Sequence, residues 1–439
     1  MSLYTLGLND NIIKALLEKG YSEPTPIQKS LIPAIFKGND IIAGAQTGTG
    51  KTAGFALPVL EELSKKMVAH KHYPKALIIV PTRELAKQVY ASFEMYGKYL
   101  PLKSLVLYGG ANLTSQANRL KRGADIIVTT SGRLLEHIYQ KNIDLNSIEY
   151  LILDEADTIL DMGFVGEVSK VLTYLPPKKQ TILTSATLSG RVKRLSQEIL
   201  HRPKLIEIDK MGTSANNVEQ IVYPVLLEKK NELLSFLIGS KNYQHVLVFI
   251  RKKEVADEVA KELNLCGLNT AVIHGGKSSG QRTRALEGFK SKKIRVLVAT
   301  DITARGIDIP SLEVVINYDI PHVTGDYIHR VGRTGRAGKK GLAITLISPL
   351  EQVALRDVEK LMGKVLPKIR LEEYAPKVET IQKGARKDTK SFKNSEGAFG
   401  NKKNAIKVVR KSKKRKTTKR DGFKAFDKEN PNKERRKRR

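Results

Sequence analysis

The chain has 439 residues, and at about 100–200 residues per domain this length suggests two or three domains. Hydrophobic residues make up 41% of it, enough for globular cores, but no run of about 18 apolar residues occurs, which excludes an ordinary membrane helix. The single Cys266 excludes an internal disulfide or a multi-cysteine zinc site, and we expect it to be buried. The first ten residues lack the charged and apolar regions of a signal peptide, so none is expected, and the single cysteine fits a reducing cytoplasm.

The net charge of +32 indicates a polyanionic partner, and nucleic acid is the natural one. Residues 376–439 alone carry 25 Lys+Arg against 7 Asp+Glu. An acidic membrane surface is the competing partner, but no amphipathic apolar helix accompanies these charges. We therefore expect no membrane association.

Short apolar runs alternate with helical patterns through the first half of the chain. This alternation predicts βαβ units and a mainly parallel sheet, and the nearly continuous apolar character predicts strands covered on both faces. The expected strands are 40–44, 76–81, 104–108, 125–130, 150–157 and 180–187.

The pattern restarts after a polar segment at 210–217, which we interpret as a linker. The second half predicts strands at 245–250, 269–274, 294–301, 314–319 and 341–347. We therefore predict an α/β chain with two tandem lobes, 1–209 and 218–375. Residues 376–439 are rich in Gly, Asn, Ser, Lys and Arg, and we expect a disordered basic tail because they bury too little apolar surface to offset their ordering entropy.

A phosphate loop stands out at AQTGTGKT, 45–52, between an expected strand and a helical pattern. It matches G-x-x-x-x-G-K-[ST] except for Ala45 at the first position. In such a loop, backbone N–H groups surround phosphate oxygens, Lys51 reaches the β- and γ-phosphates, and the Thr52 hydroxyl ligates Mg²⁺. The alternative is an ordinary glycine turn with an exposed lysine. The expected nucleotide-binding residues of the loop are Gln46, Thr47, Gly48, Thr49, Gly50, Lys51 and Thr52.

Three carboxylates follow the apolar strand of LILDEAD, at 154–157. Such a cluster is costly to desolvate without a cation, and Mg²⁺ is the economical explanation. Asp154 is the candidate metal ligand, and Glu155 the candidate base that orients and deprotonates water. A solvated strand-end cluster is the alternative.

At this point the residues resemble a known family, the DEAD-box ATP-dependent RNA helicases. The resemblance covers about residues 3–375, and the immediate start and basic tail look most similar to bacterial RhlE-type members. It is carried by eight segments in order: GYSEPTPIQ (20–28), AQTGTGKT (45–52), PTRELAKQ (81–88), GG (109–110), DEAD (154–157), SAT (185–187), ATDITARGID (299–308) and HRVGRTGR (329–336).

The resemblance implies two tandem RecA-like lobes with ATP between them and RNA across both. It implies that Gln28 reads adenine, that Tyr21 belongs to the nucleotide site, and that Asp308 holds the ribose hydroxyls. Arg333 and Arg336 resemble arginine fingers on the γ-phosphate. Their planar guanidinium groups match phosphate oxygens and stay charged.

The same resemblance implies RNA contacts through backbone, hydroxyl and arginine groups. Such groups suit phosphates and 2′-hydroxyls rather than base edges, so sequence preference should be weak. For any one arginine alone, a solvated surface charge is the alternative. The implied contacts are Arg83, Gly110, Thr130 and Arg133 in the first lobe and Arg282, Thr300 and Arg305 in the second.

The implied mechanism is lobe closure, because Lys51 and Glu155 lie on one lobe and Arg333 on the other. ATP and RNA each favour the closed form, so each favours binding of the other. The closed form is expected to bend one RNA strand and evict its partner, with Ser185 and Thr187 coupling the γ-phosphate to closure. Two alternatives remain: a non-enzymatic RNA clamp, and a DNA translocase or repair helicase.

Three positions depart from the family pattern. Leu3 replaces a frequent aromatic residue near adenine, Ser131 replaces a proline, and Ser279 replaces a glutamine that commonly contacts RNA. Loss of the proline removes a fixed φ from the turn expected to bend RNA. None of the three removes a catalytic group. We expect a monomeric core, and the basic character is compatible with ribosomal or RNA-decay complexes.

Overall fold

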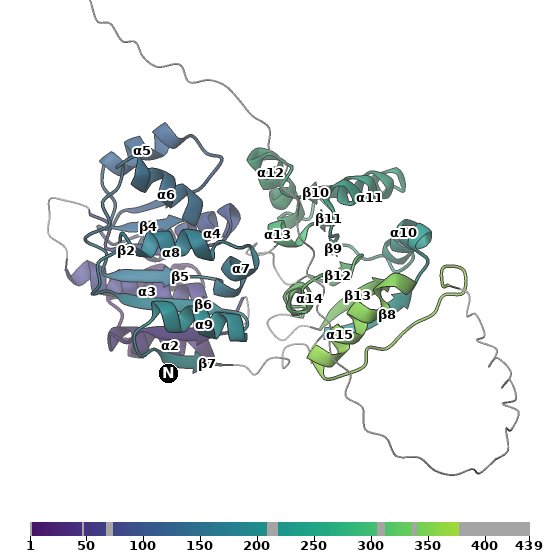
Figure 1. Ribbon diagram of the computed structural model, residues 1–439, viewed down its shortest axis with the longest axis horizontal. Coiled ribbons are helices and arrows are strands. Elements are labelled where there is room, and N and C mark those ends of the chain that lie inside the picture. The colour runs from purple at the N-terminus through teal and green to yellow at the C-terminus, as the bar shows by residue number, and fades with distance from the viewer. Residues whose placement is uncertain are drawn as a thin grey trace, which may run out of the picture. The chain divides into compact units, whose positions relative to one another are not determined.

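The computed structural model describes residues 2–45, 48–66, 73–208, 218–304, 312–335 and 340–376. The predicted linker at 210–217, nearly all of the predicted tail, and the site candidates Gln46, Thr47, Arg305, Asp308 and Arg336 lie outside these ranges. The described residues fall within one compact unit, Met1–Val378, and form two parallel sheets (Figure 1).

The first sheet has seven strands in the order β3-β4-β2-β5-β6-β1-β7, and every strand pair is parallel. The strands are β1 (Ile41–Gly44), β2 (Ala76–Ile79), β3 (Ser104–Leu107), β4 (Ile126–Thr129), β5 (Tyr150–Leu153), β6 (Gln180–Ser185) and β7 (Lys204–Glu207). The accompanying helices are η1 (Leu3–Leu6), α1 (Asp10–Glu18), α2 (Pro26–Phe36), α3 (Lys51–Lys65), α4 (Arg83–Tyr96), α5 (Leu113–Lys121), α6 (Ser131–Tyr139), α7 (Ala156–Asp161), α8 (Val165–Leu172) and α9 (Gly190–Ile199).

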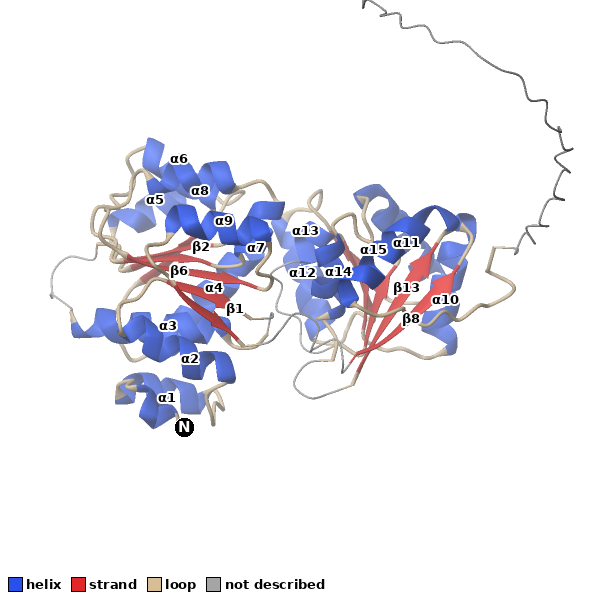
Figure 2. Ribbon diagram, turned by 60° about the horizontal axis from the view of Figure 1, so that its bottom comes forward, coloured by secondary structure: helices blue, strands red, loops and turns tan. Residues whose placement is uncertain are grey.

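Helices cover both faces of this sheet, as Figure 2 shows. Along β2, Ile78 packs with α1–α4, whereas Leu77 and Ile79 pack with α6–α9. Successive strand residues point to opposite faces, so a strand covered twice must be apolar at every position. The predicted sandwich of a parallel sheet between two helical layers is confirmed.

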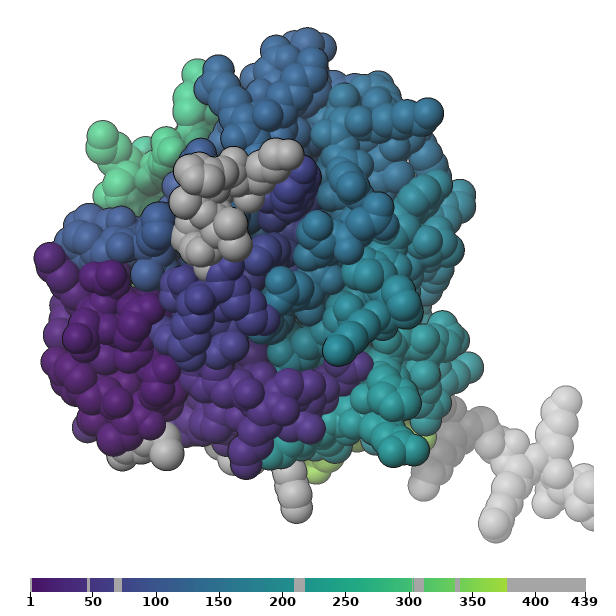
Figure 3. All heavy atoms as spheres, turned by 90° about the vertical axis from the view of Figure 1, so that its left-hand side faces the viewer, coloured from purple at the N-terminus to yellow at the C-terminus, as the bar shows by residue number. Residues whose placement is uncertain are grey.

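The N-terminal segment packs against the first lobe, and Figure 3 looks onto that face with this segment in purple. The Asn9 backbone N–H donates to Glu61 of α3 at 2.8 Å, and the Asn9 side chain caps α1. Leu3 is buried in the core, so this departure from the family pattern serves packing of η1, while Tyr4 beside it is exposed.

The second sheet has six strands in the order β10-β11-β9-β12-β13-β8, again all parallel. The strands are β8 (Val218–Pro224), β9 (Val246–Phe249), β10 (Thr270–Ile273), β11 (Val296–Ala299), β12 (Val314–Asn317) and β13 (Gly341–Ile347). The helical segments are η3 (Leu227–Lys229), α10 (Lys230–Ser240), α11 (Lys253–Leu265), α12 (Ser279–Lys290), α13 (Asp301–Ala304), α14 (Thr324–Val331), η4 (Pro349–Glu351) and α15 (Gln352–Met362). Helices α10 and α11 pack on one face, and α12, α14 and α15 on the other.

One sequence expectation is wrong: Cys266 is exposed. It follows the last residue of α11, where the helix ends and the chain turns at Gly267 with a φ of +77°. None of the helices in the described part of the chain combines the length and apolarity needed to cross a bilayer.

Candidate functional site

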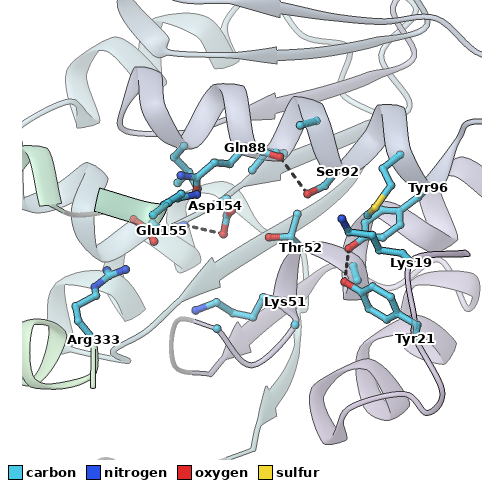
Figure 4. Close-up of a pocket in the computed structure, with 18 residues that line it drawn as sticks. Lys19, Tyr21, Lys51, Thr52, Gln88, Ser92, Tyr96, Asp154, Glu155 and Arg333 are labelled. Atoms are coloured by element: carbon cyan, nitrogen blue, oxygen red, sulfur yellow. Dashed lines mark hydrogen bonds between the residues drawn. The ribbon is translucent and has the colours of Figure 1, made fainter. Parts of the chain in front are cut away.

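Two cavities gather most of the candidate residues that the structure describes. The first, which we call the phosphate-loop cavity, has a volume of about 610 Å³. The predicted residues that line it are Tyr21, Gly48, Gly50, Lys51, Thr52, Asp154, Glu155 and Arg333. Figure 4 shows the Lys51 and Arg333 side chains both below the two acids in this view, with the Arg333 guanidinium directed toward Glu155. Groups far apart in sequence therefore meet at the carboxyl ends of parallel strands, where α/β folds bind ligands.

The strand order explains how the phosphate loop and the acids come together. Strand β6 lies between β1 and β5, and Ser185 pairs with Gly44. Gly50, with a φ of +95°, caps the N-terminus of α3, which favours anions there. A Cβ on Gly50 would lie 2.4 Å from Nε2 of Gln28, so only glycine fits.

Gln28 lies against the loop but is absent from the cavity lining. Its Nε2 donates to the Gly50 carbonyl at 3.2 Å, and its Oε1 accepts from the Thr25 backbone N–H at 2.9 Å. The amide thus forms a capping box for α2 and ties that helix to the phosphate loop. Tyr21 does line the cavity, and its hydroxyl hydrogen-bonds that of Tyr96 at 2.9 Å.

The Asp154 carboxylate is buried, and its Oδ1 accepts hydrogen bonds from the Thr184 hydroxyl and from the Glu155 N–H. Burial raises the pKa of Asp154, while the Lys51 charge opposes that rise. The buried Lys51 ammonium donates to the Ala45 carbonyl. Oδ2 of Asp154 carries no hydrogen bond to a described residue and remains for a ligand.

Glu155 adopts a left-handed backbone conformation with a φ of +53°, which is costly for a residue with a side chain. Its N–H donates to Asp154 at 3.0 Å, and its carboxylate accepts from the Thr158 hydroxyl at 3.4 Å. Burial and the adjacent Asp154 charge raise the pKa of Glu155 to about 7, against the opposing charge of Arg333. A buried carboxylate with a raised pKa suits a proton acceptor.

Asp157 joins the DEAD segment to the SAT segment. Its Oδ2 accepts from the N–H of Ala186 at 3.1 Å and from the N–H and hydroxyl of Thr187 at 2.9 and 3.1 Å. His329 of the second lobe lies 3.5 Å from the same oxygen. Burial acts to raise the pKa of Asp157, but the nearby His329 and Lys51 charges and the Thr187 hydrogen bonds outweigh it and lower the pKa. Ser185 donates to the Thr187 carbonyl at 2.7 Å, which closes the turn.

The second cavity, which we call the arginine cavity, has a volume of about 350 Å³. Its predicted residues are Arg83, Thr130, Arg133 and Arg282. Arg83 begins α4 and Thr130 precedes α6, so two helix N-termini open into this space. Gly110 is not in the lining, but it lies against Arg83: a Cβ there would sit 2.3 Å from Nη1.

Several donors of the arginine cavity have no hydrogen-bond partner among the residues that the structure describes. Nε and Nη1 of Arg133 are buried and unbonded, although Glu136 lies 3.2 Å from that Nε, and Nε of Arg282 is also unbonded. Nη2 of Arg282 lies 3.1 Å from Glu84 of the first lobe. A buried donor without an acceptor is costly, so an anion that enters this cavity would be stabilised.

The remaining candidates lie at or beside these cavities, and Ser131 itself lines the arginine cavity. Thr300 hydrogen-bonds the Thr303 hydroxyl at 3.0 Å, and Thr303 lines the arginine cavity. Ser131 donates to Glu167 of α8, a bond that proline could not make. Ser279 starts α12 outside the described cavities.

Sequence reasoning missed two residues that contact the acids of the DEAD segment and several that line the phosphate-loop cavity. Thr184 directly precedes SAT and His329 opens HRVGRTGR, so both carried a local signal. The lining residues Lys19, Tyr96 and Lys290 carried none, because only the fold brings them to the phosphate-loop cavity.

Known proteins resemble this chain over both lobes. The model of the DEAD/DEAH box helicase family matches residues 25–195, and that of the helicase conserved C-terminal domain matches 228–338. The DEAD-box ATP-dependent RNA helicase CshA of Bacillus cereus is 40% identical over 81% of this chain and 67% of its own length. The ATP-dependent RNA helicase CshA of Listeria monocytogenes is 40% identical over 82% and 68%. The chain thus spans about two thirds of the length of these relatives.

Among solved structures, S. cerevisiae Dbp5 bound to RNA and ADP BeF3 matches with a TM-score of 0.76 and 28% identity, over 85% of this chain and 96% of that one. Mss116p bound to ssRNA and AMP-PNP matches with a TM-score of 0.76 and 26% identity, over 84% and 78%. Both similarities extend over the two sheets.

Proposed function

The chain belongs to the DEAD-box family of ATP-dependent RNA helicases, and we propose that its two lobes hydrolyse ATP in response to RNA and open RNA duplexes locally. One observation carries this proposal: Lys51 and Glu155 of the first lobe line the same cavity as Arg333 of the second. A γ-phosphate held there meets groups from both lobes. Hydrolysis then depends on how the lobes are arranged.

We propose specific roles for the cavity residues. Lys51 neutralises the β- and γ-phosphates, Glu155 orients and deprotonates the attacking water, and Arg333 stabilises charge on the transferred phosphoryl group. Tyr21 and Gln28, which both lie in the GYSEPTPIQ segment (20–28), would hold the adenine. Of the other proposed contacts, Thr49 lies in the described part of the loop; Gln46, Thr47, Asp308 and Arg336 lie outside the described residues.

A divalent cation fits the donors present. The described residues contain no group of three or more His, Cys, Asp or Glu that would form a complete metal cage. Mg²⁺ commonly needs only one or two protein oxygens besides substrate phosphates, and Thr52 with Oδ2 of Asp154 would supply them. When bound, Mg²⁺ would neutralise charge on the phosphates.

Gln28 supports an adenine role only indirectly, because both ends of its amide already bond within the protein. An amide has two donors and a two-lone-pair acceptor, so it retains one N–H and one lone pair for a base. We propose that these remaining positions read the adenine edge.

We propose that RNA phosphates occupy the arginine cavity. The unbonded donors of Arg133 and Arg282 support this, as does the mixture of first-lobe and second-lobe residues in the lining. RNA that spans both lobes favours the same arrangement as ATP, which accounts for reciprocal coupling. Asp157, which touches His329 and the SAT turn, is placed to relay that arrangement.

One assay tests the function: steady-state ATP hydrolysis without nucleic acid, with RNA, and with DNA. We expect stimulation by RNA. Stimulation by DNA alone would identify a DNA translocase. Binding without turnover would identify a non-enzymatic clamp, although the presence of Lys51, Glu155 and Arg333 favours an enzyme.

We also propose that residues 376–439 tether RNA through their charge. Their 25 Lys+Arg against 7 Asp+Glu should release counterions on binding, and linkage to the lobes raises the local concentration of duplex. Deletion of 376–439 should therefore reduce the dependence of duplex binding on salt. An unchanged slope would contradict the tether. We include in this proposal a cytoplasmic location and action on ribosomal or RNA-decay complexes, because both are consistent with the positive charge of the chain.

A further inference from the structure

A buried hydrogen-bond chain runs through the first lobe outside both cavities. Its members are His137 on α6, Gln116 on α5 and Asn142 just after α6. His137 is fully buried and Gln116 is 5% exposed. Helices α5 and α6 lie side by side in both ribbon views (Figures 1 and 2). Polar side chains this deeply buried need partners, so their connections are informative.

The chemistry of the partners fixes the direction of each bond. Nδ2 of Asn142, which can only donate, lies 3.3 Å from Nδ1 of His137, so Nδ1 must accept. The ring proton therefore sits on Nε2, which donates to Oε1 of Gln116 at 3.2 Å. Nε2 of Gln116 in turn donates to the Tyr108 carbonyl at 3.1 Å. The chain thus runs from Asn142 through His137 and Gln116 to the backbone of Tyr108.

The end of α6 holds Asn142 in place for this bond. Lys141 takes a φ of +55°, its N–H donates to the Ile138 carbonyl at 2.9 Å, and the Asn142 N–H donates to the His137 carbonyl at 2.9 Å. These two bonds form a Schellman motif, which turns the chain back over the last helical turn. The Asn142 side chain is thereby fixed beside the imidazole.

The other end of the chain reaches the proposed RNA contacts. Tyr108 directly precedes Gly109 and Gly110, where Gly109 lines the arginine cavity and Gly110 lies against Arg83. His137 also lies one turn after Arg133 on α6, and residues four apart share a helix face. Both routes lead from the imidazole to groups that face the arginine cavity.

We propose that His137 is a positioning residue for RNA, a role that rests on the proposed RNA-binding function. Through Gln116, His137 fixes the Tyr108 carbonyl. The fixed carbonyl in turn holds the Gly109–Gly110 turn, which faces the RNA backbone. The neutral ring satisfies both neighbours as they are placed, because a second ring proton would point at the Asn142 amide donor. Burial and the Arg133 charge lower the pKa of His137 to about 4, which keeps the ring neutral at physiological pH.

The test is the effect of His137→Leu and His137→Gln on two half-saturation constants of ATP hydrolysis. For His137→Leu we expect the constant for poly(U) RNA to rise about tenfold, because Gln116 loses its partner and the turn loosens. The constant for ATP, measured at saturating RNA, should change less than about twofold. His137→Gln retains a donor and an acceptor and should recover most of the RNA affinity.

His245→Leu is the matched control. His245 is also buried and bonds a backbone carbonyl, that of Phe289 at 3.1 Å, but it lies in the second lobe outside the arginine cavity. It measures the general effect of losing a buried imidazole. If His137→Leu and His245→Leu give the same RNA constant, the positioning role is wrong. If the unaltered protein shows no RNA stimulation, the proposed function itself fails.

Asn142→Ala is a second test, which remains available if the His137→Leu protein does not fold, because it leaves the imidazole in place. We expect a rise in the RNA constant of about threefold, because the ring loses the donor that fixes its tautomer. In a His137→Gln background, Asn142→Ala should change the RNA constant by a different factor than it does in the original protein. The reason is that Asn142 and His137 act through the same hydrogen-bond chain. An Asn142→Ala protein with lower thermal stability but an unaltered RNA constant would overturn the proposal.

Discussion

The phosphate-loop cavity and the arginine cavity hold their charged groups in different ways. In the first, Asp154, Glu155 and Lys51 each bond to the protein through directed hydrogen bonds. In the second, Arg133 and Arg282 face carboxylates but keep buried donors without hydrogen bonds. Bond cleavage requires fixed geometry before the substrate arrives, whereas binding of a repetitive backbone requires donors that remain available. Substitutions should therefore affect turnover in the first cavity and RNA affinity in the second.

The largest effect should come from Arg333→Ala. Removal of this guanidinium takes away charge stabilisation at the γ-phosphate, and such arginine fingers contribute about 10³–10⁵ in rate. We expect RNA-stimulated turnover to fall by about 10³ or more while RNA binding persists. The measurement is steady-state phosphate release at saturating RNA and ATP.

Arg356→Ala is the control for Arg333, because Arg356 lies exposed on α15 away from both cavities. It should retain full turnover. An Arg333→Ala protein that keeps turnover within about threefold of the original would remove the second lobe from the chemistry.

Glu155→Gln should lower turnover by about 10²–10⁴, the range for loss of a general base. Since the amide preserves the shape, ATP and RNA should still bind, and the complex should persist because hydrolysis cannot release it. Dissociation of labelled RNA under excess ATP measures this persistence. Glu61→Gln alters a buried carboxylate of α3 outside the described cavities and should leave RNA release unchanged. Rapid RNA release from Glu155→Gln would contradict the coupling of hydrolysis to release.

Arg133→Ala should affect affinity rather than turnover. Loss of one phosphate contact should weaken RNA binding by about tenfold and reduce the salt slope by about one unit. Turnover at saturating RNA should stay nearly constant. Arg194→Ala removes the same charge from the exposed face of α9 and provides the control. If the two variants have equal salt slopes, the arginine cavity does not bind RNA phosphates.

The two cavities also differ in how far sequence alone could predict them. Lys51, Asp154 and Glu155 sit in short contiguous motifs at strand ends, so spacing and the parallel-sheet pattern sufficed to place them together. The contacts that orient the charged groups are long-range: in the phosphate-loop cavity Thr184 reaches Asp154 across 30 residues, and in the arginine cavity Glu84 meets Arg282 from the other lobe. The place of Thr184 beside SAT signals its importance, but motif spacing does not say which residue contacts which.

The strands also differ in how far the sequence predicts them, and the difference follows how continuously apolar each strand is. The predicted strands match every central strand and also β3 and β10 at two of the edges, because these strands are mostly apolar along their length. The expectations omitted β7 and β8, which lie at sheet edges. Edge strands have fewer neighbours, and the mixed exposure of Lys204–Glu207 and Val218–Pro224 weakens the apolar signal. The prediction that Cys266 is buried was wrong for a related reason. Residue type predicts only average burial, whereas the position of Cys266 at the end of α11 exposes it to solvent.

The smallest effect should come from Ser131, where two replacements separate the hydrogen bond from the backbone. Ser131→Ala loses the bond to Glu167 and should destabilise the first lobe by about 1 kcal/mol. Ser131→Pro loses the same bond, but proline suits the first position of α6, and Thr130 before it is already extended with a ψ of 144°. Proline also restricts the unfolded chain, which contributes about 0.4–1 kcal/mol in the opposite direction. Thermal unfolding should therefore rank the original protein first, Ser131→Pro close behind and Ser131→Ala last. If the Ser131→Pro protein is less stable than the Ser131→Ala protein, the backbone at this turn does not accept the fixed φ of proline. Serine would then be required at this position by its backbone conformation and not by its hydroxyl.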